Sequence, residues 1–145
     1  MSATEHALEL VRVAALAAAD KKAERIMAFD VSEQLAVADA FVLASAGNDR
    51  QVRAIVEEIE DQLREQLGEK PLRREGHQQG RWVLLDYADV VIHVQHTEER
   101  QFYSLERLWR DCPAIELPAE LGESAGQAAD DDEGDDPDAL APSID

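Results

Sequence analysis

Residues 49–67 place their apolar side chains on one face of a helix. The spacing i, i+3, i+4, i+7 is the repeat of an α-helix with one buried side. Asn48 can cap this helix, with Gln51 at the third helical position, and Gly68 and Pro71 end it. The stripe consists of Val52, Ile55, Val56, Ile59, Leu63 and Leu67. A helix of this kind needs a sheet to pack against.

Short apolar runs on both sides of this helix predict such a sheet. The strands are expected at residues 26–31, 41–44, 72–75, 81–86 and 89–95. A first helix is expected at residues 3–20, and Thr97 can cap a last one. The order α-β-β-α-β-β-β-α predicts an α/β domain, with a mixed sheet of about five strands and flanking helices.

Only Tyr87 and Ala88 separate the last two predicted strands, which suits a two-residue hairpin. Neither residue is Gly or Asn, so the usual hairpin turns fit poorly and a longer loop is an alternative. The helix that follows is predicted to bury a stripe of Phe102, Leu105 and Trp109.

The cysteine content and the N-terminus bear on the compartment. Cys112 is the only cysteine, so no internal disulfide can form, and no Cys/His set resembles a zinc site. No apolar run is long enough to span a bilayer. The N-terminus lacks the basic region of a signal peptide and the Arg-rich character of a transit peptide. These features predict a cytoplasmic protein without membrane association.

Negative charge dominates the composition, with a formal net charge of −18. Residues 114–145 hold 11 acids and no Lys or Arg, whereas residues 1–113 hold 21 acids against 14 bases. A folded domain is therefore predicted at residues 1–113, followed by an acidic, disordered tail at residues 114–145. A negative body repels phosphate backbones, which argues against direct general nucleic-acid binding and favours a basic protein partner.

Three short patterns suggest chemistry, and each has a structural alternative. Residues 45–48 could bind a phosphate, but they lack the glycines and the Lys of a P-loop, and a turn with an Asn cap is favoured. Asp86 and Asp89 could hold magnesium for nucleotidyl transfer, but their spacing puts them on opposite faces of a strand. The spacing of His93 and His96 likewise argues against zinc. Because no catalytic, cofactor or metal set is complete, a non-enzymatic protein is predicted.

Trp82 and Leu84 share one face of their predicted strand. If helices leave that face partly uncovered, these residues and the nearby Tyr87 form an exposed aromatic patch, a usual anchor of protein interfaces. A position in the core is an equal alternative from these residues alone. The patch hypothesis predicts a protein that docks on a partner.

Six ordered segments resemble the ribosomal silencing factor family, also called the Iojap-like family. They are DKKAERI at residues 20–26, FDVSE at 29–33, ADAFVLASAGNDRQVRAI at 38–55, EG at 75–76, WVLLDYADVVIHV at 82–94 and RQFYSLERLW at 100–109. The motifs occur in order and at familiar spacing, so the resemblance is specific. It covers residues 5–110 and leaves out the acidic tail.

This resemblance implies a nucleotidyltransferase-like fold without the catalytic carboxylates, and no cofactor. It implies binding to ribosomal protein fourteen of the large subunit, on the face that meets the small subunit. The bound factor would block association of the subunits and repress translation under nutrient limitation. The contact residues that the resemblance implies are Trp82, Leu84, Asp86, Tyr87, Asp89 and His93, with Glu75 and Arg100 in addition.

Three residues depart from the pattern common in that family. Ala88 stands where Gly is common, Gln95 where an apolar residue is frequent, and Arg25 where an acid is common. The first departure could shift the hairpin that carries the patch. A nucleotide-binding or nucleotidyltransferase enzyme is the alternative function, and an adaptor that recruits a basic partner through its acidic tail is a third. A homodimer through an apolar patch is a further hypothesis.

Overall fold

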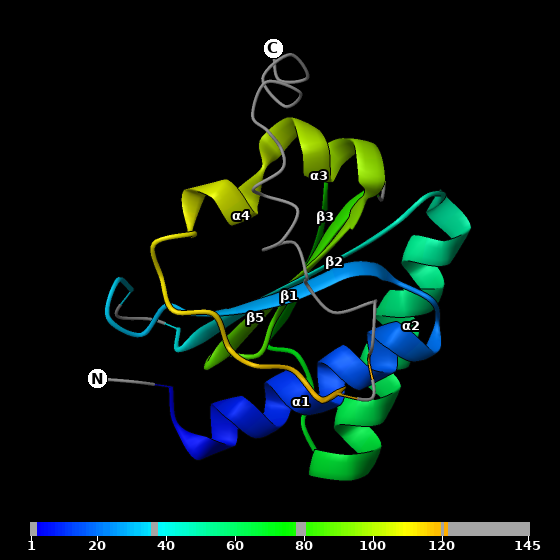
Figure 1. The fold of residues 1–145 in the computed structure, drawn as a ribbon. Coiled ribbons are helices and arrows are strands. Elements are labelled where there is room, and N and C mark those ends of the chain that lie inside the picture. The colour runs from blue at the N-terminus through cyan, green and yellow to red at the C-terminus, as the bar shows by residue number, and fades with distance from the viewer. Residues whose placement is uncertain (1–2, 36–37, 78–80, 120, 122–145) are drawn as a thin grey trace.

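The computed structural model describes residues 3–35, 38–77, 81–119 and 121. A five-stranded sheet lies between α1 and α2 on one side and α3 and α4 on the other (Figure 1). None of the helices within the described ranges is long and apolar enough to cross a bilayer. In chain order the elements are α1 (Glu5–Asp20), β1 (Glu24–Asp30), β2 (Ala40–Ala46), α2 (Asp49–Leu67), β3 (Arg73–His77), β4 (Trp82–Asp86), β5 (Val90–His96), α3 (Thr97–Tyr103) and α4 (Leu105–Leu108).

The strands lie in the order β1-β2-β5-β4-β3. Only β2 and β5 are parallel, and the other three neighbouring pairs are antiparallel. A parallel pair needs a crossover connection, which here contains α2 followed by β3 and β4. The predicted α/β class and the mixed sheet of about five strands are therefore confirmed.

Helix α2 has the predicted bounds because its stop and start signals are local. The Asn48 side chain accepts a hydrogen bond from the Gln51 backbone N–H at 2.8 Å, which satisfies one of the free amides at the helix start. Gly68 ends the helix at φ 68°, in the left-handed region that an L side chain disfavours. Five of the six predicted stripe residues are buried, and Leu67 is partly buried.

The two faces of the sheet carry separate apolar cores. Helices α1 and α2 cover the first face, where Val42, Ile92 and Val94 are fully buried. The second face holds a smaller core of Phe29, Val31, Ala38, Leu43 and Cys112. Because successive side chains of a strand point to opposite faces, β2 and β5 contribute to both layers. The smaller core leaves part of the second face accessible.

The last predicted helix is broken in two. Ser104 adopts φ 50°, which ends α3 and starts α4 in a new direction. Leu105 and Trp109 therefore pack against the smaller core, but Phe102 is 62% exposed. The prediction of one continuous buried stripe is wrong for Phe102, because a stripe holds its phase only along an unbroken helix.

The chain returns after α4 to cover the outer edge of β1. The backbone N–H of Asp30 donates to the Pro113 carbonyl at 2.8 Å, and that of Ile115 donates to the Ala28 carbonyl at 2.9 Å. This contact protects an edge that could otherwise pair with another chain. The packed body thus extends past the predicted boundary at residue 113, since Leu121 is buried in the main core. Residues 122–145, the rest of the predicted tail, lie outside the described residues.

Candidate protein-docking surface

Strand β4 presents Trp82, Leu84 and Asp86 on the sheet face that lies away from α1 and α2. Val83 and Leu85 point the other way, into the main core. The three outward residues are half-buried, so each is held by its neighbours and yet reachable. Such anchored side chains are suited to an interface, because little of their freedom is lost on binding.

The same face continues onto the neighbouring strands. On one side, Glu75 of β3 is paired with Leu84. On the other side, Val91 of β5 is paired with Asp86. We define the docking surface as seven of the half-buried residues of this face, namely Phe41, Glu75, Trp82, Leu84, Asp86, Val91 and Trp109.

A row of four aromatic rings crosses this surface. The ring centroids of Trp82 and His93 are 6.0 Å apart, and those of His93 and Phe41 are 5.3 Å apart. Phe41 then meets Trp109 edge-on, with centroids separated by 5.1 Å. Edge-to-face and tilted pairs at such distances are favourable beyond the area they bury. The row runs from β4 across β5 and β2 to the residue after α4.

Phe41 was missed as a site residue from the sequence, and Trp109 was expected only as part of a buried stripe. The strand period already puts Phe41 and Leu43 on one face. Knowing that this is also the face of His93 requires the parallel pairing of β2 with β5, which joins segments far apart in the chain. The sequence alone gives no signal for that register.

His93 lies beneath the surface and binds the Trp82 side chain. Its side chain is 7% exposed, and its Nδ1 accepts a hydrogen bond from the indole N–H of Trp82 at 3.2 Å. The histidine therefore fixes the orientation of the indole ring. Its small exposed fraction allows little direct contact with a partner, so the predicted contact role of His93 is better described as positioning.

The edge of the docking surface near β3 is acidic. Glu75 and Asp86 lie on either side of Arg73, whose guanidinium is 3.0 Å from the Glu75 carboxylate and 3.3 Å from that of Asp86. The Arg73 side chain is 63% exposed. Exposed ion pairs of this kind contribute little to stability, so a cation from a partner can replace Arg73 at small cost.

The hairpin between β4 and β5 turns through three residues, longer than the two first predicted. The Asp89 backbone N–H donates to the Tyr87 carbonyl at 2.9 Å, around Ala88 at φ 75°. This i to i+2 hydrogen bond with a positive φ has the form of a γ-turn, which is strained for an L residue. The Asp86 carboxylate stabilises the turn, because it accepts from the Ala88 N–H at 2.8 Å. Asp89 is exposed at the tip.

Tyr87 does not belong to the exposed surface. It is 4% exposed and packs in the main core, on the α1 and α2 side of the sheet. Burial raises the pKa of its hydroxyl, and the nearby Glu60 carboxylate adds to the shift. The prediction that Tyr87 joins Trp82 in an exposed patch is therefore wrong, because Tyr87 continues the alternation of Val83 and Leu85 and lies on their side of the sheet.

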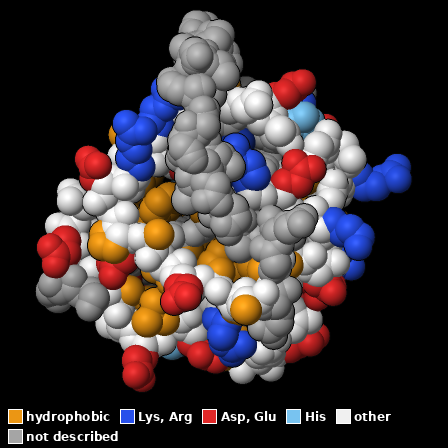
Figure 2. All heavy atoms as spheres, in the orientation of Figure 1, with side chains coloured by type: hydrophobic (Ala, Val, Ile, Leu, Met, Phe, Trp, Pro, Cys, Tyr) orange, Lys and Arg blue, Asp and Glu red, His pale blue; other side chains and the backbone are white. Residues whose placement is uncertain are grey.

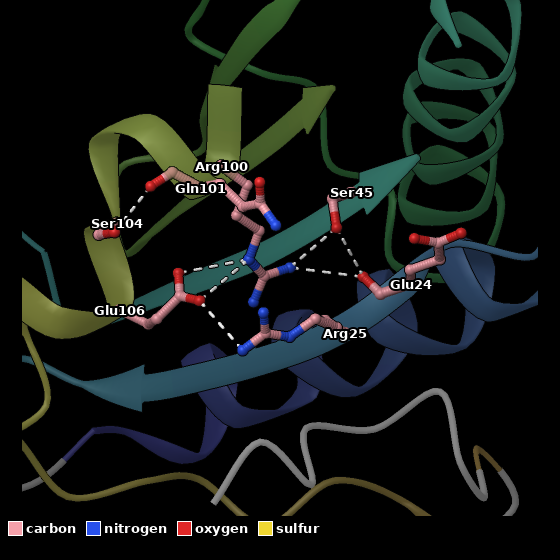
Figure 3. A network of polar contacts seen from close by, with 7 residues as sticks. All are labelled: Glu24, Arg25, Ser45, Arg100, Gln101, Ser104 and Glu106. Carbon is pink, nitrogen blue, oxygen red and sulfur yellow. Dashed lines mark hydrogen bonds and ion pairs between the residues drawn. The ribbon is translucent and has the colours of Figure 1, made fainter. Parts of the chain in front are cut away.

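Arg100 is buried and holds α3 on the sheet. It is 2% exposed, and its guanidinium reaches the Ser45 hydroxyl at 3.2 Å and the Glu106 carboxylate at 3.3 Å (Figure 3). Glu106 also binds Arg25, one of the departures from the family pattern, at 3.3 Å. Burial lowers the pKa of Arg100, and the Glu106 charge opposes that shift. The predicted contact role of Arg100 conflicts with this burial, and the residue is a structural anchor.

The chemical alternatives find no support in the geometry. Both Asp86 oxygens are engaged, one by the Ala88 N–H and the other by Arg73. Asn48 caps α2, and the Ser45 hydroxyl donates to the Glu24 carbonyl. Within the ranges that the structure describes, no three His, Cys, Asp or Glu side chains are grouped to hold a metal ion. Asp86, Asn48 and Ser45 thus make contacts that stabilise the fold.

Comparison with known proteins settles the family. A family model described as "Ribosomal silencing factor during starvation" matches residues 4–141. The chain belongs to the ribosomal silencing factor family. It is 44% identical over 108 residues to ribosomal silencing factor RsfS of Bacillus subtilis, covering 74% of this chain and 91% of that protein. It is 31% identical over 107 residues to the chloroplastic protein Iojap of Zea mays, covering 72% of this chain and 45% of that protein.

Solved structures share the fold of this silencing-factor family member. A crystal structure of a Bacillus halodurans protein superposes with a TM-score of 0.65 at 41% identity, covering 76% of this chain and 99% of that one. A Chromobacterium violaceum protein gives a TM-score of 0.67 at 33% identity, covering 71% of this chain and 85% of that one. The resemblance inferred from the six sequence segments is therefore confirmed.

Proposed function

We propose that this protein silences ribosomes by binding ribosomal protein fourteen of the large subunit through the docking surface, in the cytoplasm, without making or breaking a covalent bond. The observation that carries the proposal is the accessible aromatic row with an acidic edge, in a chain whose family is named for ribosome silencing. Membership in the family supports the ribosome as the target. The identity of the ribosomal protein comes from the family resemblance.

The mechanism is steric. A folded body that covers the large subunit's contact face leaves no room for the small subunit, so translation falls in proportion to the occupied large subunits. The factor needs affinity and placement for this, and no catalytic group. Trp82 is the natural anchor, because large aromatic residues dominate interface energies. His93 holds the indole in place before the partner arrives, which reduces the entropy lost on binding.

Charge supports a basic partner. The acids outnumber the bases in residues 1–113 as well as in the whole chain, so the net charge of the protein attracts cations. At the docking surface, Glu75 and Asp86 offer carboxylates next to an apolar centre. Arg73 partly neutralises them in the free protein. A Lys or Arg of the partner would compete with Arg73 for the same oxygens.

The direct test is co-sedimentation with isolated ribosomal subunits, followed by a subunit-joining assay. The wild-type protein should sediment with large subunits and not with small ones, and it should reduce joining. Trp82→Ala should weaken binding by about 2 kcal/mol, roughly 30-fold, if Trp82 is the anchor. The matched control is Gln66→Ala, an exposed neutral residue on α2 at the other side of the sheet. A folded Trp82→Ala variant with unchanged inhibition would remove the aromatic row from the interface.

The electrostatic part has its own test. Asp86→Asn should slow association, whereas Arg73→Gln should speed it, because the second change removes a positive charge from the same site. Both differences should shrink as salt rises. Association rates measured by stopped flow against the purified ribosomal protein report the effect. Equal rates for the two variants at low salt would contradict the charge argument.

A further inference from the structure

An apolar groove lies away from the docking surface, along the outer side of α1. It has a volume of about 790 Å³ and runs between the helix and the segment that returns along β1. The described residues that line it are Glu5, Leu8, Glu9, Val11, Arg12, Ile115, Glu116, Leu117 and Pro118. Its volume is within the range of ligand sites, but the groove is more open than enclosed, which suits a peptide segment better than a small molecule.

Two elements build this groove. From α1 come Leu8, Glu9 and Arg12, at the spacing of one helical face. From the returning segment come Ile115 and Leu117, held in place because the Ile115 N–H donates to the Ala28 carbonyl at 2.9 Å. Hydrophobic side chains gather between charged ones where α1 and this segment lie (Figure 2). The floor is thus apolar and the walls are fixed by the fold.

Leu8 marks the groove as incompletely covered. Leu8 is 40% exposed, although Val11, three residues further along α1, is buried. One of the four large hydrophobic residues found exposed in the described part of the chain therefore lies in a concave site. An apolar side chain from another molecule would remove Leu8 from water.

The charges at the rim select the occupant. The lining residues of the groove include three acids, Glu5, Glu9 and Glu116, and one base, Arg12. The Arg12 guanidinium is 2.6 Å from the Glu9 carboxylate. A second copy of this chain carries a net charge of −18 and would be repelled, as would an anionic membrane surface. Residues 122–145 hold nine acids and no base, so the chain's own C-terminal segment is repelled as well. A cationic partner gains attraction at the same rim.

We propose that this groove is a second docking site, which takes a basic protein segment with apolar anchor residues flanked by Lys or Arg. The segment lies along α1 with its apolar side chains over Leu8 and its cations beside the three rim glutamates. This site and the docking surface face opposite sides of the sheet. Both can be occupied at once, so the second contact adds avidity or recruits a further protein.

The test uses a fluorescein-labelled amphipathic Leu/Lys peptide and anisotropy at physiological ionic strength, with the full-length chain. Wild-type protein should bind it, and a Ser/Lys peptide of equal charge should bind at least about fivefold more weakly because it lacks the apolar anchors. Leu8→Ser should weaken Leu/Lys peptide binding by about tenfold, as expected for loss of one buried Leu contact. Glu116→Lys should weaken it as well, by reversing a rim charge.

Matched controls separate this site from general attraction to an acidic chain. Leu72→Ser changes a 69% exposed leucine outside the groove, and Glu57→Lys reverses an exposed acid on α2. Both should leave peptide affinity unchanged, because neither residue lines the groove. Equal loss in Leu8→Ser and Leu72→Ser would overturn the proposal. So would a rise in affinity for Leu140→Ser, since that result would show that the chain's own C-terminal segment fills the groove.

Discussion

Gln95→Met should stabilise the protein. Gln95 is 0% exposed on β5, and neither its amide nitrogen nor its amide oxygen has a hydrogen-bond partner in the structure. The backbone register sets it opposite Ser45 on one side and Trp82 on the other. A carboxamide in such a place has lost its hydrogen bonds to water on folding and has formed none with the protein. Methionine has nearly the same length and flexibility but no strongly polar atoms.

The magnitude follows from the desolvation of one unpaired amide. Protein mutational data put the cost of a buried polar group without a partner at roughly 1–3 kcal/mol. A volume-conserving substitution in a packed core introduces some packing strain, which usually costs less than about 1.5 kcal/mol and offsets part of this gain. The net expectation is a gain of about 1.5 kcal/mol in the free energy of unfolding. With a urea slope typical of small domains, the midpoint should rise by roughly 1 M.

Urea denaturation followed by circular dichroism measures this gain. The control is Gln101→Met on α3, where the glutamine is exposed and the change should stay within about 0.5 kcal/mol. Because Gln95 has no accessible surface, partner binding by the folded variant should be unchanged. A Gln95→Met variant less stable than wild type would show that the amide is satisfied in solution, and would refute the reasoning.

Four further expectations test the fold around the docking surface. Arg100→Met should lower the unfolding free energy by about 2 kcal/mol, through loss of charge-assisted hydrogen bonds, whereas Arg107→Met at an exposed position should change it little; parallel urea titrations compare the two. Asn48→Ala should cost about 1 kcal/mol and lower the helical circular dichroism signal during early unfolding, because the α2 cap is lost. Ala88→Gly should raise the free energy of unfolding by about 0.5 kcal/mol, because the relief of left-handed strain at Ala88 exceeds the larger chain entropy that glycine loses on folding. A lower thermal midpoint would contradict the turn assignment. Burial raises the pKa of the Cys112 thiol, so a thiol-reactive dye should label it slowly at neutral pH and fully in denaturant; rapid labelling of the folded protein would show that the smaller core opens.

Local signals were enough for several elements. The α2 bounds follow from Asn48, whose side chain caps the first turn, and from Gly68, which can adopt the left-handed conformation that ends the last turn because it has no side chain. The separation of Trp82 from Val83 follows from the strand period. The family resemblance followed from six segments read in order. The helix bounds and the strand alternation depend on neighbours in the chain, so they can be read from the sequence directly.

The sequence by itself determined the element order as far as β5, the acidic character and a strand that carries Trp82, Leu84 and Asp86 on one side. Only the tertiary structure decided which predicted contact residues reach the surface. Tyr87 is buried in the main core on the side of Val83 and Leu85, and Arg100 is buried against Ser45 and Glu106. The physical reason is that exposure depends on strand pairing and helix packing between distant segments, and a residue's own chemistry does not specify either.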